Sequence, residues 1–283
     1  MARFTNQAQL RYGNAIANSN IAVGEILEVL SATKTAVRKN YGRNDTITYL
    51  VSVINAGNTA FTGLTLTDNL GAYVYNTQTL VPLRYIDGTV KYYSNGTLQA
   101  APAVTAGPPL VISGLTVPAN GSILIAYETD VNEYAPLDVE AEIVNTATIR
   151  GTGITPVTVQ ETVSAGSEPI LTITKSISPV PVTENGTLTY TFLIQNTGNV
   201  AVEEAAASVV TDQFNPILSN LTVTFNGTAW AETTNYIYNE DTGLFSTVPG
   251  QITVPAATFA QDELTGAWNV TPGVSTLVIT GTI

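Results

Sequence analysis

The sequence predicts an all-β protein built from two consecutive antiparallel β-sandwiches. Three observations point to this: apolar and polar residues alternate with period two, turn sequences such as NG, DG and PG separate the alternating runs, and the same strand pattern occurs twice. Such alternation is typical of strands with one buried face. No stretch has the pattern of a long amphipathic helix, and 283 residues suffice for two domains with a core each.

Self-comparison is the strongest evidence for two domains. The matched segments are TITYLVSVINAGN (46–58) with TLTYTFLIQNTGN (187–199), LSATKTA (30–36) with LTITKSI (171–177), LTLTDNL (64–70) with SVVTDQF (208–214), and VPANGSILIAYET (117–129) with TPGVSTLVITGTI (271–283). The first two pairs share one offset, and the offset grows in the third pair and again in the last. The repeat predicts Ig-like sandwiches over residues 25–165 and 166–283, preceded by an N-terminal donor strand and linker over residues 1–24.

The second repeat is expected to lack its closing strand. The first repeat ends with EIVNTATIRG (142–151), which has no counterpart in the second repeat, whereas RFTNQAQLR (3–11) has the same pattern. An incomplete sandwich exposes unpaired backbone groups that an extended segment can fill. We therefore expect residues 3–11 of one chain to complete the second domain of another.

The inward row of this donor strand consists of Phe4, Asn6, Ala8 and Leu10. Because donor and acceptor lie at opposite ends of the chain, the contact is head-to-tail and propagates into a filament. The alternative is intramolecular, with the N-terminus folding back onto its own second domain.

Alternation also places one Lys, one Asp and one Asn on core-facing positions of each repeat. The sets are Lys34, Asp68 and Asn145 in the first domain, and Lys175, Asp212 and a donated Asn6 in the second. Burying an unpaired charge is costly, so the pattern needs an explanation. One interpretation is a buried ion pair with a hydrogen-bonded Asn.

The other interpretation is an isopeptide bond. Burial lowers the pKa of a Lys and raises that of an Asp, which favours a neutral amine and a protonated carboxyl. The carboxyl can polarise the Asn carbonyl and move protons while the amine attacks and ammonia leaves.

Two segments resemble a known group of proteins. TYTFLIQNTGN…TDQF and TYLVSVINAGN…TDNL are similar to the domain-of-unknown-function repeat of bacterial and archaeal surface proteins, although INAGN replaces NTGN in the first repeat. The order Lys, Asp, Asn is similar to that of collagen-adhesin A-type domains of Gram-positive adhesins and pili. The resemblance implies Asp-assisted Lys–Asn bonds. These are Lys34–Asn145 within the first domain, with Asp68, and Lys175–Asn6 between subunits, with Asp212.

Composition narrows the function further. The net charge of -12 disfavours nucleic-acid and anionic-membrane partners. Absence of Cys and His removes disulfides, the usual zinc ligands and the commonest general base, so we expect no cofactor, no metal and no turnover enzyme. A glycan hydrolase using two carboxylates is a distant alternative. No run is apolar enough to span a membrane, and the N-terminus lacks a secretory leader, so we expect a removed leader or another export route.

These expectations combine into one function. The chain is expected to be a structural subunit of an extracellular or spore-surface fibre, such as a pilus or an endospore appendage. Its partners are further copies of itself, and a tip adhesin or an anchoring protein stays open as an additional partner. The alternative is a non-polymerising adhesin or binding module of a bacterial surface protein.

Overall fold

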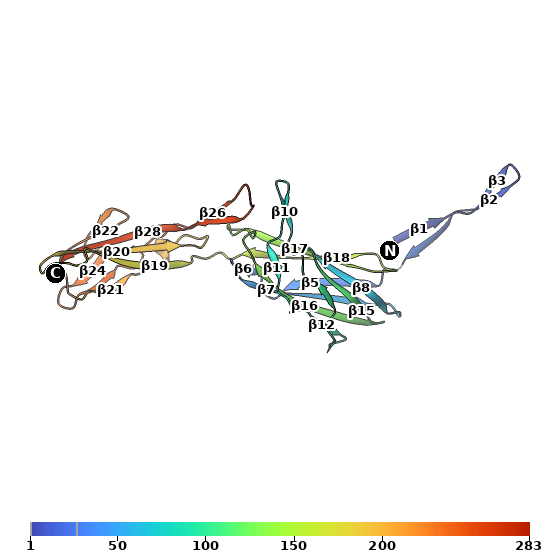
Figure 1. The fold of residues 1–283 in the computed structure, drawn as a ribbon, viewed down its shortest axis with the longest axis horizontal. Coiled ribbons are helices and arrows are strands. Elements are labelled where there is room, and N and C mark those ends of the chain that lie inside the picture. The colour runs from blue at the N-terminus through green and yellow to red at the C-terminus, as the bar shows by residue number, and fades with distance from the viewer. Residues whose placement is uncertain (1, 27) are drawn as a thin grey trace. The chain divides into compact units, whose positions relative to one another are not determined.

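The computed structural model describes residues 2–26 and 28–283, and these form antiparallel sheets in two compact units (Figure 1). Unit 1 comprises Met1–Ala135 and Ile143–Val163, and unit 2 comprises Pro136–Glu142 and Ser164–Ile283. The helical content of the described residues is the short 3-10 helix η1 (Glu204–Ala206). Accordingly, none of these residues belongs to a helix that is long and apolar enough to cross a membrane.

The first sheet of unit 1 has the order β13-β12-β16-β7-β5, with β11 also paired to β16. Its strands are β5 (Leu30–Ala36), β7 (Thr46–Asn55), β11 (Leu83–Tyr85), β12 (Lys91–Ser94), β13 (Thr97–Leu98) and β16 (Gly121–Val131). Every second residue of β7 and β16 is buried, because one face of the sheet packs on the core.

The second sheet of unit 1 has the order β14-β15-β8-β17-β18-β6. Its strands are β6 (Asn40–Tyr41), β8 (Phe61–Asp68), β14 (Ala103–Thr105), β15 (Leu110–Val117), β17 (Glu142–Arg150) and β18 (Val157–Ala165), and a separate hairpin consists of β9 (Tyr73–Tyr75) and β10 (Gln78–Leu80). β8 is an interior strand, paired with β15 on one side and β17 on the other.

Unit 2 has a five-stranded sheet, β19-β20-β28-β22-β23, a three-stranded sheet, β21-β25-β24, and a hairpin, β26-β27. The strands are β19 (Leu171–Ser178), β20 (Thr187–Asn196), β21 (Thr211–Gln213), β22 (Ser219–Phe225), β23 (Thr228–Trp230), β24 (Tyr236–Asn239), β25 (Leu244–Thr247), β26 (Thr258–Gln261), β27 (Trp268–Thr271) and β28 (Gly273–Thr282). An aromatic cluster around Phe214 and Phe245 forms much of its core.

The two units repeat the same strand pairing, with one difference from the sequence alignment. Asn55 on β7 pairs with Gly121 on β16, and Asn196 on β20 pairs with Gly273 on β28. Gly121 therefore corresponds to Gly273, whereas the sequence alignment of 117–129 with 271–283 matches it to Ser275, so the expected alignment of this segment is wrong by two positions. A shift of two keeps the same residues facing the core, which is why alternation alone could not detect it.

The repeated Asn of the INAGN and QNTGN segments has a structural role. The side-chain amide of Asn196 donates to the carbonyls of Val200 at 2.7 Å and Pro255 at 3.1 Å, and its oxygen accepts from Gly198 at 2.9 Å. Asn55 is equally buried and makes the equivalent contacts in unit 1. Each Asn thus supplies partners for backbone groups at a buried turn.

The N-terminal segment forms a hairpin with itself, which we call the arm (residues 2–26). β1 (Ala2–Asn6) pairs with β4 (Ala22–Ile26), and β2 (Gln9–Tyr12) pairs with β3 (Ala15–Asn18). The backbone pairs of the arm's strands are all with each other, and its side chains are mostly exposed. The arm has a first limb (residues 2–12) and a return limb (residues 15–26), joined by the turn at Gly13. Part of the expected linker is therefore strand, because the return limb pairs with the first limb.

Candidate crosslinking sites

In unit 1, a Lys and an Asp from opposite sheets meet in the core. Lys34 lies on β5 and Asp68 at the end of β8, and their side chains form an ion pair that is closed to solvent. The Nζ of Lys34 donates to Oδ2 of Asp68. The pair therefore connects the two layers of the sandwich through a single carboxylate oxygen.

The carboxylate of Asp68 has further donors. The hydroxyl of Tyr127, on β16, donates to the same Oδ2, and the backbone N–H of Leu70 donates to Oδ1 at 2.9 Å. Hydrogen bonds to a buried carboxylate compensate for its lost hydration. These donors hold the carboxyl group in one orientation beside the amine.

The amine of Lys34 lies against two aromatic rings. Its Nζ is 4.8 Å from the ring centroid of Tyr49 and 6.0 Å from that of Tyr127, which stack on each other. Burial lowers the pKa of Lys34 to about 8, although Asp68 opposes part of this shift. Roughly a tenth of amines with such a pKa are neutral at pH 7, so a nucleophilic form is accessible.

Asn145, on β17, completes the cluster. Its side chain is fully buried, yet neither the amide oxygen nor the amide nitrogen has a hydrogen-bond partner, and the hydroxyl of Tyr49 is in the same situation. Burial raises the pKa values of Tyr49 and Tyr127, and a side-chain hydrogen-bonding interaction with Asn145 opposes the rise for both. The amide therefore lies beside these tyrosines, although no contact has the geometry of a normal hydrogen bond. A buried amide without a normal hydrogen bond is costly, so its presence beside the two tyrosines that line the Lys34–Asp68 pair needs a reason.

Unit 2 contains the corresponding pair in a more open setting. Lys175 on β19 donates to Oδ2 of Asp212 on β21, but 38% of the Lys side chain is exposed. The amine lies over aromatic rings, 4.3 Å from the ring centroid of Tyr190 and 5.5 Å from that of Phe214. In both units the Lys and the Asp that the sequence analysis selected therefore form an ion pair.

The edge of the sheet beside this second pair is open. β21 pairs with β25, and no strand in the described part of the chain pairs its other edge, where β17 pairs β8 in unit 1. The inward row of β19 is exposed in consequence: Leu171, Ile173 and Ile177 are 42%, 53% and 44% accessible. Three apolar side chains beside an unpaired strand edge are an unusual surface for a single chain.

The structure does not bring Asn6 to this pair. Asn6 lies on β1, opposite Ala22 of β4, and its side chain is exposed, as are those of Phe4, Ala8 and Leu10. The single chain thus contains an unfilled Lys–Asp site and an exposed strand that carries an Asn.

Sequence reasoning missed the two tyrosines of the first site. Tyr127 falls on an inward position of the segment 117–129, so a polar group among apolar neighbours was the available signal. In unit 2, Ile279 takes the place opposite Tyr190 that Tyr127 takes opposite Tyr49, so Asp212 has no equivalent tyrosine partner. The two sites therefore share the Lys and the Asp but differ in what holds the carboxylate.

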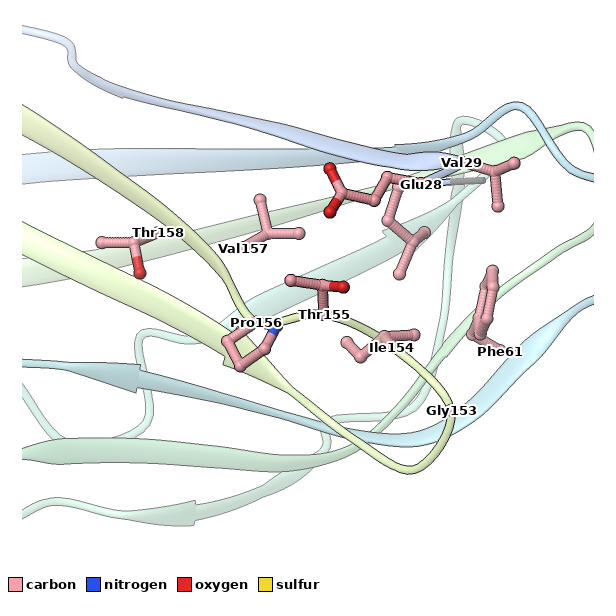
Figure 2. Close-up of a pocket in the computed structure, with 10 residues that line it drawn as sticks. Glu28, Val29, Phe61, Gly153, Ile154, Thr155, Pro156, Val157 and Thr158 are labelled. Atoms are coloured by element: carbon pink, nitrogen blue, oxygen red, sulfur yellow. The ribbon is translucent and has the colours of Figure 1, made fainter. Parts of the chain in front are cut away.

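A pocket elsewhere in unit 1 is separate from this chemistry. It has a volume of about 270 Å³ and is lined by residues 28–30, Phe61 and residues 153–158 at the β17–β18 turn (Figure 2). Its lining combines apolar side chains with Glu28, Thr155 and Thr158 and includes none of the candidate crosslinking residues. Among residues 2–26 and 28–283, no acidic cluster of three could hold a metal ion.

Comparisons with known proteins identify no family for this chain. No family model matches the chain, and no curated protein matches it. Among solved structures, the major pilin subunit of Bacillus cereus matches at 12% identity over 96% of this chain and 73% of that one, with a TM-score of 0.36. The pilus backbone of Streptococcus pneumoniae matches at 14% identity over 86% of this chain and 55% of that one, with a TM-score of 0.35.

The collagen-binding domain of a Staphylococcus aureus adhesin also matches. It has 12% identity over 50% of this chain and 99% of that domain, with a TM-score of 0.32. The all-β architecture is therefore similar to that of Gram-positive pilin and adhesin domains. At these identities and TM-scores the similarity carries no argument about function, so the function is argued below from the residues.

Proposed function

We propose that this protein is the structural subunit of an extracellular or spore-surface fibre. The arm of one subunit completes unit 2 of the next, so that subunits assemble head-to-tail. Lys175–Asn6 bonds lock the joints between subunits, and Lys34–Asn145 bonds brace unit 1. The surface location follows from the resemblance of the TYT…NTGN…TD segments to repeats of surface proteins.

One observation carries the proposal. In unit 2 the Lys175–Asp212 pair and the apolar row of β19 lie beside an open strand edge, at the place where unit 1 has β17 with Asn145. The arm presents an Asn and apolar residues at matching intervals, and it is exposed. Adding the strand would bury the exposed row and pair the free backbone groups of β21.

Formation of the bond needs no reactant other than Lys34, Asp68 and Asn145. A proton moves from the Nζ of Lys34 to Asp68, which leaves a neutral amine and a protonated carboxyl. The amine attacks Cγ of Asn145, a Cγ–Nζ bond forms, and the Cγ–Nδ2 bond breaks. One of the two protons released by the amine is delivered through Asp68 to the leaving nitrogen, which departs as ammonia, and the other stays on the carboxyl of Asp68. The product is a neutral secondary amide that needs no buried charges.

The test is electrophoresis after boiling in SDS. The intact protein should give a ladder of multiples, and mass spectrometry should show one ammonia lost per bond. Asn6→Ala should abolish the ladder and leave the bond of unit 1 in place. Asn20→Ala, a substitution of an exposed Asn in the same arm, is the matched control and should leave the ladder unchanged. A ladder undiminished in Asn6→Ala would refute the assignment, and a wild-type protein that stays monomeric would refute the polymer.

A further inference from the structure

The open edge of unit 2 lacks more than one strand. In unit 1 the sheet continues beyond β8 through β17 and β18 to β6, whereas in unit 2 the corresponding sheet stops at β21 within the described residues. Among the described residues, neither limb of the β17–β18 hairpin therefore has a counterpart in unit 2. A single added strand would fill one of these positions and leave a new open edge.

The arm has the dimensions of that hairpin. β17 and β18 with their turn cover positions 142–165, and the matching part of the arm covers positions 3–26, so the two segments are equal in length. Both are two-stranded with a turn near the middle. Asn145 precedes Lys175 by 30 residues, and Asn6 precedes Lys34 by 28. The chain between each hairpin and the Lys of the next domain therefore has a similar length.

The side chains at one pair of facing positions differ in size between the β17–β18 hairpin and the arm, but in a compensating way. The hydroxyls of Thr148 and Thr158 meet at 3.1 Å, and Ala165 donates its N–H to the carbonyl of Ala141 at 2.7 Å. Both contacts give one register, which places Ile143 opposite Val163, and both of these side chains are buried.

In the arm, the corresponding position pairs Phe4 with Gly24. A Cβ added at Gly24 would collide with the ring of Phe4, so the ring covers the glycine. A larger residue on one limb is thus matched by a smaller one on the other, as expected when a pair fills a fixed volume in a core.

A second comparison concerns the contact that the return limb makes with the opposite sheet. In unit 1 the register places Glu161 of β18 opposite Asn145, and Glu161 accepts from the N–H of Ala36 at 3.1 Å and pairs with Lys39. Glu161 therefore connects β18 to the last residue of β5 and to Lys39, which follows it.

The counterparts of these residues in unit 2 and in the arm are apolar. When the alignment of LSATKTA with LTITKSI is continued, Ile177 and Val180 take the places of Ala36 and Lys39, and both are exposed. The arm has Ala22 opposite Asn6, where β18 has Glu161. The charge is thus absent from both sides of the prospective contact, which is the change expected if Ala22 packs against Ile177 and Val180.

From these relationships we propose that the arm is donated whole, as a two-stranded hairpin, to unit 2 of a second copy of this chain. The first limb pairs with β21 and the return limb lies beside it, with Ala22 facing Ile177 and Val180. The inference rests on the proposed head-to-tail assembly and specifies which part of the chain the acceptor recognises. Each joint between subunits then repeats the β17–β18 hairpin of unit 1.

The test uses the full-length chain and charge substitutions on the return limb. Ala22→Glu should slow formation of the SDS-resistant ladder by about tenfold or more, because it places a carboxylate against an apolar surface. Adding Val180→Lys should restore the rate, because the double variant recreates the Glu161–Lys39 pair. Val23→Glu adds the same charge on the opposite face of the limb and should leave the rate unchanged.

The outcomes separate this inference from the proposed function. If wild type and Ala22→Glu form ladders at the same rate, a single strand is donated, and the hairpin proposal is wrong while the fibre stands. A block in Ala22→Glu that Val180→Lys does not relieve, or an equal block in Val23→Glu, would also overturn it. If wild type forms no ladder, the head-to-tail assembly itself fails. Ala22 is exposed in the single chain, so the substitution disturbs neither core.

Discussion

Tyr127 and Lys34 donate to the same oxygen, Oδ2 of Asp68, from one sheet of unit 1 to the other. The carboxylate is thus held between a phenol and an amine in a site closed to water. Next to it, the amide of Asn145 is buried without a partner. A buried amide without a normal hydrogen bond, beside the tyrosines that contact an amine of lowered pKa, is unfavourable, and the proposed bond would relieve this cost.

The first prediction concerns Asn145. Asn145→Ala should remove the loss of ammonia from unit 1 and lower its free energy of unfolding by about 4 kcal/mol, since a crosslink between positions 34 and 145 restricts a long loop in the unfolded chain. Mass spectrometry and urea unfolding would measure both effects. Val144→Ala, next to it on the exposed face, is the control and should keep the bond. Equal unfolding midpoints for wild type and Asn145→Ala would argue against a crosslink.

The second prediction is a pH dependence that appears only without the bond. In Asn145→Ala the amine of Lys34 can titrate, and burial lowers its pKa from 10.5 to about 8 in the folded state. Between these values the unfolded chain binds more protons than the folded one, so the free energy of unfolding should rise as the pH increases above about 8. If Lys34 of the wild type forms the proposed amide bond, the wild type should lack this rise.

The control for that measurement is the double variant Asn145→Ala/Lys34→Met. It retains every other titrating group, including the tyrosines, and should lose the rise. Chemical unfolding of the three proteins from neutral pH to well above the lowered pKa of Lys34 gives the comparison. A stability of Asn145→Ala that falls with pH over this range relative to the double variant would contradict the assignment.

The third prediction separates assembly from locking. Asp212→Ala removes the group proposed to move protons for Lys175 but keeps the apolar row of β19 and the open edge of β21. Subunits should therefore still associate, and boiling in SDS should separate them completely. Electron microscopy of the fibres beside denaturing gels would show both properties. Asp262→Ala, in the β26–β27 turn, should behave as wild type, and an SDS-resistant ladder in Asp212→Ala would remove Asp212 from the reaction.

The fourth prediction concerns the repeated turn Asn. Asn196→Ala should leave the N–H of Gly198 and the carbonyls of Val200 and Pro255 without their partner, at a cost of about 2 kcal/mol or more. The loss should appear in the unfolding of unit 2, while unit 1, with its own Asn55, keeps its midpoint. Proteolysis of partly unfolded protein would show which unit opens first.

Much of the fold could be read from local patterns. Period-two alternation correctly indicated strands, and it placed Lys34, Asp68 and Asn145 on inward positions, because neighbouring side chains of a strand must point to opposite faces. The shared offset of the first two matched segments related β5 to β19 and β7 to β20 for the same reason. By contrast, a shift by two positions in the last strand left the inward face unchanged and so escaped notice.

The chain's own residues determined which side chains face inward, which Lys accompanies which Asp, and that the arm resembles a strand of unit 1. Tertiary structure alone decided that Tyr127 shares the carboxylate, that Asn145 is unpartnered, and that the arm pairs with itself as a hairpin. The shared carboxylate depends on a contact between segments far apart in sequence, β8 with β16, and the arm's hairpin depends on which of several possible partners β1 pairs with. Alternation fixes the direction of a side chain within a strand, but which strand lies across from it is settled only when the sheets pack.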